Sequence, residues 1–107
     1  ELADVVYSLH RKYFPKTEMF GLSSQIQRAA DSVSLNIAEG STGQTNKEFA
    51  RFLKIALRSD IEVVGCLNLA IRRKYISEVE HQLIYQKCEE ILVMINGLKA
   101  SVLKPKQ

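Results

Sequence analysis

A row of four cations has the spacing of a phosphate-binding surface. The row consists of Lys47, Arg51, Lys54 and Arg58. Steps of four, three and four residues place these side chains on one face of a helix, and Arg72 or Arg73 continues the row if the helix stays straight. Lysine and arginine side chains on one face can neutralise successive phosphates and release their counterions. A solvated helix face is the alternative. No aromatic residue interleaves the row, so the pattern does not predict base stacking.

The distribution of charge favours the same segment. The chain of 107 residues has a formal net charge of +3. Residues 41–76 hold seven basic and three acidic side chains, whereas residues 1–40 hold four basic and five acidic ones. The positive excess is therefore concentrated around the cationic row, which is more informative than the total.

A second row of polar residues lies earlier in the chain, with two possible partners on the next helix. The set consists of Arg28, Ser32, Asn36 and Glu39, together with Ser59 and Glu62. These side chains can satisfy one another's hydrogen bonds, so we interpret them as a buried polar network that fixes helix register. The alternative is a site for a small ligand or a catalytic site.

No pattern of residues indicates a metal centre or an enzyme. Glu78 and His81 match half of a di-iron bundle signature, which needs a second Glu-x-x-His pair. His10 is preceded at that spacing by Tyr7, which is not a carboxylate. The glycines at 40 and 43 suit a turn and do not form a phosphate-binding loop. We therefore predict a non-enzymatic protein without metal or cofactor.

Apolar periodicity predicts four helices. The first covers residues 2–13, and the numbered chain is expected to begin inside it. The second starts at Ser23 or Ser24, the latter with a capping box to Gln27, and Gly40 is expected to end it by adopting positive φ. Thr45 with Glu48 and Ser77 with Glu80 are capping boxes for the third and fourth. Short connections between these helices predict an all-α fold with a single domain, residues 1–107, forming an antiparallel up-down-up-down four-helix bundle.

The cysteines indicate the cellular compartment of the protein, and the apolar runs indicate whether it enters a membrane or forms oligomers. Cys66 and Cys88 lie in apolar helical pattern, so we predict buried reduced thiols and a cytoplasmic location. No apolar run approaches the ~18 residues of a membrane span, so no membrane is expected as a partner. The run 91–95 is apolar on all sides of its helix, which indicates either enclosure by neighbouring helices or contact with another subunit. We favour oligomerisation.

Several of these segments resemble one bacterial family. They are Phe14-Pro15-Lys16-x-Glu18-x-Phe20-Gly21-Leu22, Gln25-Ile26-x-Arg28-Ala29-Ala30-x-Ser32-Val33, Asn36-Ile37-Ala38-Glu39-Gly40 and Glu48-Phe49-x-x-Phe52-Leu53-x-Ile55-Ala56-x-x-Ser59, followed by Glu62. Together they resemble the four-helix-bundle proteins named after the intervening sequences of bacterial 23S ribosomal RNA genes. Ser34-Leu35 stands where that family often has proline and a small residue, a departure that affects helix geometry.

The resemblance implies a homopentamer with a central channel. The related accessory variability proteins of diversity-generating retroelements are similar barrels that bind a reverse transcriptase and nucleic acid, so it also implies such partners. The leading hypothesis is an oligomeric bundle that binds RNA or DNA without sequence preference. The alternative is a protein–protein adaptor or scaffold whose charges serve solubility only.

Overall fold

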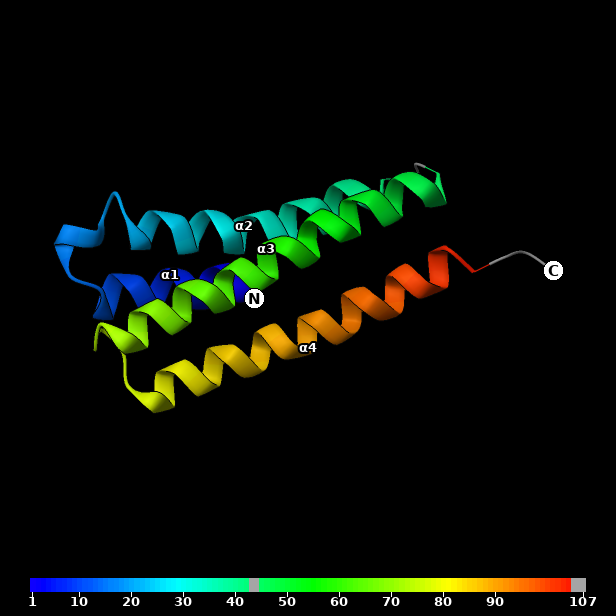
Figure 1. Ribbon diagram of the computed structural model, residues 1–107. Helices are drawn as coiled ribbons and strands as arrows, with labels where there is room; N and C mark the ends of the chain where they lie inside the picture. The colour runs from blue at the N-terminus through cyan, green and yellow to red at the C-terminus, as the bar shows by residue number, and fades with distance from the viewer. Residues whose placement is uncertain (43–44, 105–107) are drawn as a thin grey trace.

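The computed structural model describes residues 1–42 and 45–104, and all regular structure in these ranges is helical. The helices are α1 (Leu2–Tyr13), α2 (Leu22–Gly40), α3 (Asn46–Arg72) and α4 (Glu78–Val102), with a 3-10 helix η1 (Lys16–Glu18) after α1. Successive helices run antiparallel and in contact, and α4 also contacts α1 (Figure 1). The predicted up-down four-helix fold is confirmed. Gly43, part of the expected turn, lies outside the described residues.

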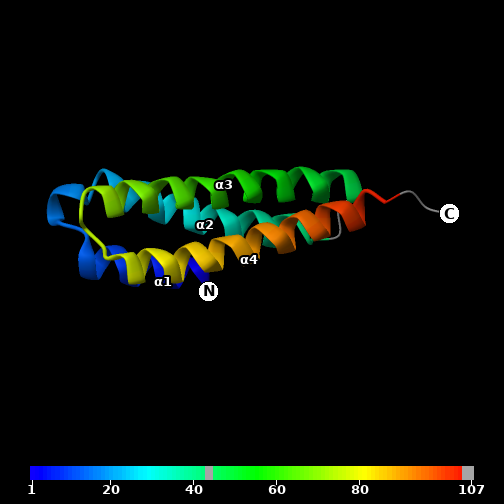
Figure 2. The same ribbon diagram turned by 60° about the horizontal axis from the view of Figure 1, so that its bottom comes forward.

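The helices differ in length, which gives the rod two unlike ends. The molecule measures 53 × 23 × 17 Å. At 1.5 Å per residue α1 is about 18 Å long and α3 about 40 Å, so α1 lies along only one part of the rod (Figures 1 and 2). We call the end that contains η1 and the α3–α4 turn the clamped end. The three-helix end is where the last turns of α2, the first turns of α3 and the last turns of α4 pack without α1.

Each end has its own apolar cluster. The larger cluster, at the clamped end, draws on all four helices and includes the fully buried side chains of Val6, Ile26 and Leu67. The smaller one has only Leu53, Ala56 and Ile95 as buried members, with half-buried neighbours around them. The enclosure of the core therefore weakens where α1 is absent.

A polar layer separates the two clusters on α3. Ser59 and Asp60 follow Ala56 of the smaller cluster and precede Val63 of the larger one. The Asp60 side chain is 1% exposed, and its Oδ1 atom has no hydrogen-bond partner. Burial raises the pKa of Asp60 to about 6, although a hydrogen bond with the Cys88 thiol acts in the opposite direction.

The clamped end is held by the carboxylate of Glu18. Its Oε1 atom accepts the backbone N–H of Leu22 at 3.0 Å, and its Oε2 atom accepts from Arg73 Nη1 at 3.0 Å and from the Tyr75 hydroxyl at 2.7 Å. The Leu22 N–H, then the Tyr75 hydroxyl and Arg73, hold the pKa of Glu18 below its ordinary value. One side chain thus ties the α1–α2 connection to the α3–α4 turn.

This contact also corrects the predicted start of α2. The helix begins at Leu22 with Gly21 at its N-cap, and no side-chain cap from Ser24 forms. Glu18 takes the place of that cap. Gln27 instead donates from Nε2 to the Asp31 carboxylate at 2.9 Å. The local capping signal was overridden because a better acceptor approaches from η1.

Gly40 ends α2 as predicted, but the prediction that it does so by adopting a positive φ is wrong. Gly40 keeps the helical conformation as the last residue of α2. A Cβ atom at this position would lie 2.8 Å from Phe49 Cδ1 and 2.9 Å from Phe52 Cβ. The glycine therefore allows α2 and α3 to approach closely, and no left-handed turn is involved.

Two further local predictions, a capping box and two buried thiols, are confirmed. The Ser77–Glu80 capping box forms at the start of α4, with both reciprocal hydrogen bonds present. Cys66 and Cys88 are buried and free. Among the described residues, no helix has the length and apolar character needed to cross a membrane.

Candidate nucleic-acid interface

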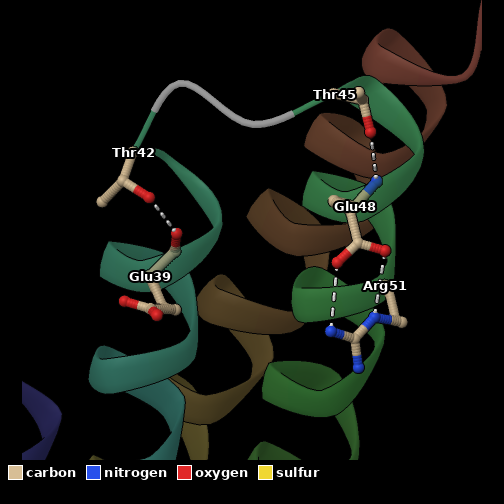
Figure 3. A network of polar contacts seen from close by, with 5 residues as sticks. All are labelled: Glu39, Thr42, Thr45, Glu48 and Arg51. Atoms are coloured by element: carbon tan, nitrogen blue, oxygen red, sulfur yellow. Dashed lines mark hydrogen bonds and ion pairs between the residues drawn. The ribbon is translucent and has the colours of Figure 1, made fainter.

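The four cations of the row, Lys47, Arg51, Lys54 and Arg58, lie exposed on the first half of α3. They begin at the three-helix end, immediately after the Thr45 cap, whose Oγ1 accepts the N–H of Glu48 at 3.2 Å (Figure 3). The opposite face of the same turns carries Leu53 and Ala56 into the smaller core cluster. Burial of that apolar face fixes the rotation of α3, and the row faces water as a result.

Among the four cations of the row, Arg51 alone has a counter-charge within the described part of the chain. Its Nη2 and Nε atoms donate to the Glu48 carboxylate at 3.1 and 3.4 Å (Figure 3), so the predicted Thr45–Glu48 capping box is formed in one direction only. The Arg51 guanidinium also lies 4.8 Å from the centre of the Phe52 ring. The cations of Lys47, Lys54 and Arg58 take part in no ion pair within residues 1–42 and 45–104. These three carry the uncompensated charge of the row.

The two arginines expected to extend the row are placed differently from its four members. Arg72 is exposed, but it lies fourteen residues beyond Arg58, about 21 Å along the helix axis. The exposed side chain of Ile61 comes between them. Arg73 turns toward the clamped end and pairs with Glu18 at 3.0 Å. The continuous cationic surface therefore ends at Arg58.

The structure brings together three of the six residues proposed as a polar network. Ser59 Oγ donates to Ser32 Oγ at 2.8 Å, which links α3 to α2. Asn36 Nδ2 donates to Ser32 Oγ at 3.0 Å and to the Ser32 carbonyl at 2.8 Å. Ser59 is buried and the other two are half-buried. This small cluster lies on the same level of α3 as Asp60.

The remaining three residues, Arg28, Glu39 and Glu62, are exposed in the protomer. Their expected burial does not hold, because the polar row of α2 lies beside the buried stripe of Ile26, Ala30 and Val33 and not within it, so its longest side chains reach water. Glu39 uses its backbone carbonyl to accept from Thr42 Oγ1 at 2.7 Å, and its carboxylate is free of that contact (Figure 3). The network is thus smaller than the sequence suggested, and the three residues left out of it face solvent.

A metal site is not assembled in the described residues. No group of three or more histidine, cysteine, aspartate or glutamate side chains there could hold a metal ion. His81 instead forms a hydrogen bond of 2.8 Å between its Nε2 atom and Asn68 Oδ1. The His81 side chain of this incomplete di-iron motif therefore pairs with Asn68 on α3.

Asp60 is the buried polar residue that sequence reasoning missed. The signal was present, because Leu53, Ala56, Asp60, Val63 and Leu67 follow one another at steps of three and four. A charged residue inside such an apolar stripe faces the core. The contacts of Glu18 gave no comparable signal, because its partners are distant in sequence.

The geometry thus defines a four-helix bundle with an exposed cationic row and a small internal polar layer. Its relatives agree with this class. The family of the 23S rRNA-intervening sequence protein matches residues 1–97, and the chain belongs to that family. The resemblance read from the sequence motifs is confirmed.

A solved structure shares the fold along nearly the whole chain. It is the crystal structure, at 1.70 Å resolution, of a protein with unknown function from the S23 ribosomal protein family of Bacteroides thetaiotaomicron. It is 25% identical in sequence with a TM-score of 0.77, and the match covers 92% of this chain and 98% of that one. No curated protein sequence matches the chain.

Proposed function

We propose that this protein is a non-enzymatic, self-associating helical bundle that binds RNA or DNA without sequence preference. The observation that supports it is the uncompensated cationic row on α3, formed by Lys47, Lys54 and Arg58 with Arg51 among them. Phosphate contacts of this kind give affinity by releasing counterions and carry no sequence information.

The surroundings of the row favour phosphate contacts over base contacts. Phe52, the aromatic residue beside Arg51, is half-buried and already covered by that guanidinium. The ring is therefore occupied, and the row offers a bound strand only charge. At the row itself, duplex and single-stranded nucleic acid are expected to bind alike.

Self-association is supported by the surface of α4. Within the apolar run 91–95, Ile95 is fully buried, whereas Val93 is 69% and Met94 is 47% exposed. The protomer thus leaves part of the run uncovered, and a second subunit would remove it from water. We propose the homopentamer that the family resemblance implies, because five copies of the row around an axis would strengthen the positive field.

A salt titration with matched variants tests the nucleic-acid role. Replacing Lys54 and Arg58 together by alanine should weaken binding to all sequences alike and flatten the slope of log affinity against log salt by about two. The control replaces Lys87, an exposed cation of α4, and Lys104, an exposed cation just after its end, and changes the net charge equally. Fluorescence anisotropy at several salt concentrations measures both.

Two results would contradict the proposal. Wild-type protein that shows no salt-dependent binding to RNA or DNA would make the row a solvated surface. Equal losses from both variant pairs would mean diffuse attraction without a defined interface.

The adaptor remains the second candidate function, because α4 also exposes Val79 and Leu83 outside the run 91–95. These side chains suit contact with another protein, such as the reverse transcriptase that the resemblance implies. Light scattering coupled to gel filtration, together with the titration above, separates the candidates. A pentamer that binds nucleic acid supports the first, whereas a chain without affinity for nucleic acid supports the second.

A further inference from the structure

A groove at the clamped end lies apart from the cationic row. It has a volume of about 760 Å³ and is formed by α1, the η1 turn and the start of α2. Small-molecule sites commonly fall between about 300 and 1,000 Å³. Phe14 and Ser23 are its most buried lining residues, each at 8% exposure. His10 is held in place by a hydrogen bond of 2.8 Å to Gln27.

The charge that lines the groove has one sign. Its lining includes the exposed cations of Arg11, Lys16 and Arg28, and no aspartate or glutamate. The nearest carboxylate in sequence, that of Glu18, is engaged by Leu22, Arg73 and Tyr75. Cations without internal counter-charges favour an anionic ligand.

The rim of the groove also presents aromatic surface to water. Phe20 is 94% exposed and Tyr7 is 49% exposed. Tyr7 is positioned by Arg11, which donates to its hydroxyl at 2.8 Å and lies 5.4 Å from its ring centre. The Phe20 ring contributes little to the stability of the fold, because it buries little apolar surface. Its ring faces are free for a planar partner.

We propose that this groove binds an unpaired nucleotide of a single-stranded nucleic acid. Phe20 offers a stacking surface to the base, and Arg11, Lys16 and Arg28 offer charge to the adjacent phosphates. Exposed aromatic rings beside cations are the combination by which proteins hold single strands without sequence readout. The ligand class rests on the proposed function, but the surface is different from the row on α3. The row tracks phosphates in any nucleic acid, whereas the groove requires an unstacked base.

The test compares a short oligouridylate with an RNA duplex of the same length, by fluorescence anisotropy. Phe20→Ala should lower the affinity for the single strand about tenfold or more and leave the affinity for the duplex unchanged. The control is Leu35→Ala, which removes another exposed apolar side chain, 67% exposed on α2, and should alter neither. Because Phe20 packs against little, the variant should fold, and circular dichroism verifies this.

A charge variant supplies an independent arm. Replacing Arg11 and Lys16 together by alanine should weaken single-strand binding and flatten its salt slope by about one. The double variant of Lys54 and Arg58 should weaken both nucleic acids. The failure of either proposal is therefore distinguishable, because duplex binding reports only on the row.

Two outcomes would overturn the groove as a nucleotide site. In the first, Phe20→Ala binds the single strand as tightly as wild type does; a changed mass by light scattering in that case would make Phe20 a subunit contact. In the second, Phe20→Ala weakens single strand and duplex equally, which would exclude base stacking.

Discussion

At the clamped end four helices surround an apolar cluster, and the Glu18 carboxylate joins two connections that are distant in sequence. At the three-helix end α2, α3 and α4 pack around three buried residues, and the α2–α3 connection contributes no comparable tie among the described residues. The uncompensated cations of the row on α3, Lys47, Lys54 and Arg58, lie at this second end. The comparison indicates that core packing is concentrated at one end of the molecule, whereas the cationic row lies at the other.

The largest test of this comparison uses one leucine from each cluster. Leu67 and Leu53 are both fully buried, so each replacement by alanine loses the same transfer free energy. Leu67→Ala should cost about 4 kcal/mol, because four helices prevent collapse of the cavity. Leu53→Ala should cost about 2 kcal/mol, since the three-helix end can relax into the space. Chemical denaturation measures both, and equal losses would show that the two ends are packed alike.

The boundary between the clusters gives the next effect, and it depends on pH. The pKa of Asp60 is raised by burial from 3.8 to about 6, so the folded state takes up a proton that the unfolded state releases. The free energy of unfolding should therefore rise by about 2–3 kcal/mol as the pH falls from 7 to 4.

The matched variant Asp60→Asn should remove this rise and should be more stable than wild type at pH 7. The effect of Glu18 on the pH dependence of stability is opposite in direction. Its pKa is lowered in the folded state, so its contribution to the free energy of unfolding is lost as the pH falls through that lowered pKa. Urea denaturation at several pH values separates the two. A variant with the wild-type pH profile would contradict the assignment to Asp60.

A smaller effect compares two helical glycines near the three-helix end. Alanine at Gly40 would place a Cβ atom 2.8 Å from Phe49, and the resulting overpacking should cost about 1–3 kcal/mol. Gly97 on α4 has no atom within 4 Å of such a Cβ. Gly97→Ala should therefore stabilise the protein by about 0.5–1 kcal/mol through helix propensity alone. Thermal unfolding measures the pair, and a stabilising Gly40→Ala would refute the close approach of α2 and α3.

The sequence predicted those features that depend on neighbours within one helix. The four helices, the Ser77–Glu80 cap and the exposure of the row on α3 all follow from periodicity and local hydrogen bonding. The start of α2 was missed because its acceptor, Glu18, belongs to η1. The separation of Arg73 from the row was missed for a related reason. Its partner, Glu18, is 55 residues away in the sequence and becomes close only when η1 packs beside the end of α3.

Gly40 is a second case in which a contact with another helix could not be predicted from local sequence. Its presence after Asn-Ile-Ala-Glu was read as a helix stop, yet its environment is set by two phenylalanines from the next helix. Asp60 was detectable from its place in an apolar stripe, but its unpaired oxygen was not. The groove beside Phe20 combines residues from α1, η1 and α2, and no periodicity within one segment indicates it.

The reactivity of the buried thiols of Cys66 and Cys88 can report how often the bundle opens. Burial raises the pKa of Cys66 to about 11 and that of Cys88 to about 12, and the thiolate is the form that reacts with alkylating reagents. In the closed bundle both sulfur atoms are therefore shielded and unreactive. Alkylation then proceeds only through openings of the four-helix core that expose these thiols, and its rate reports the frequency of those openings. A single mass-spectrometric time course, in native buffer, would record how often the core opens around each cysteine.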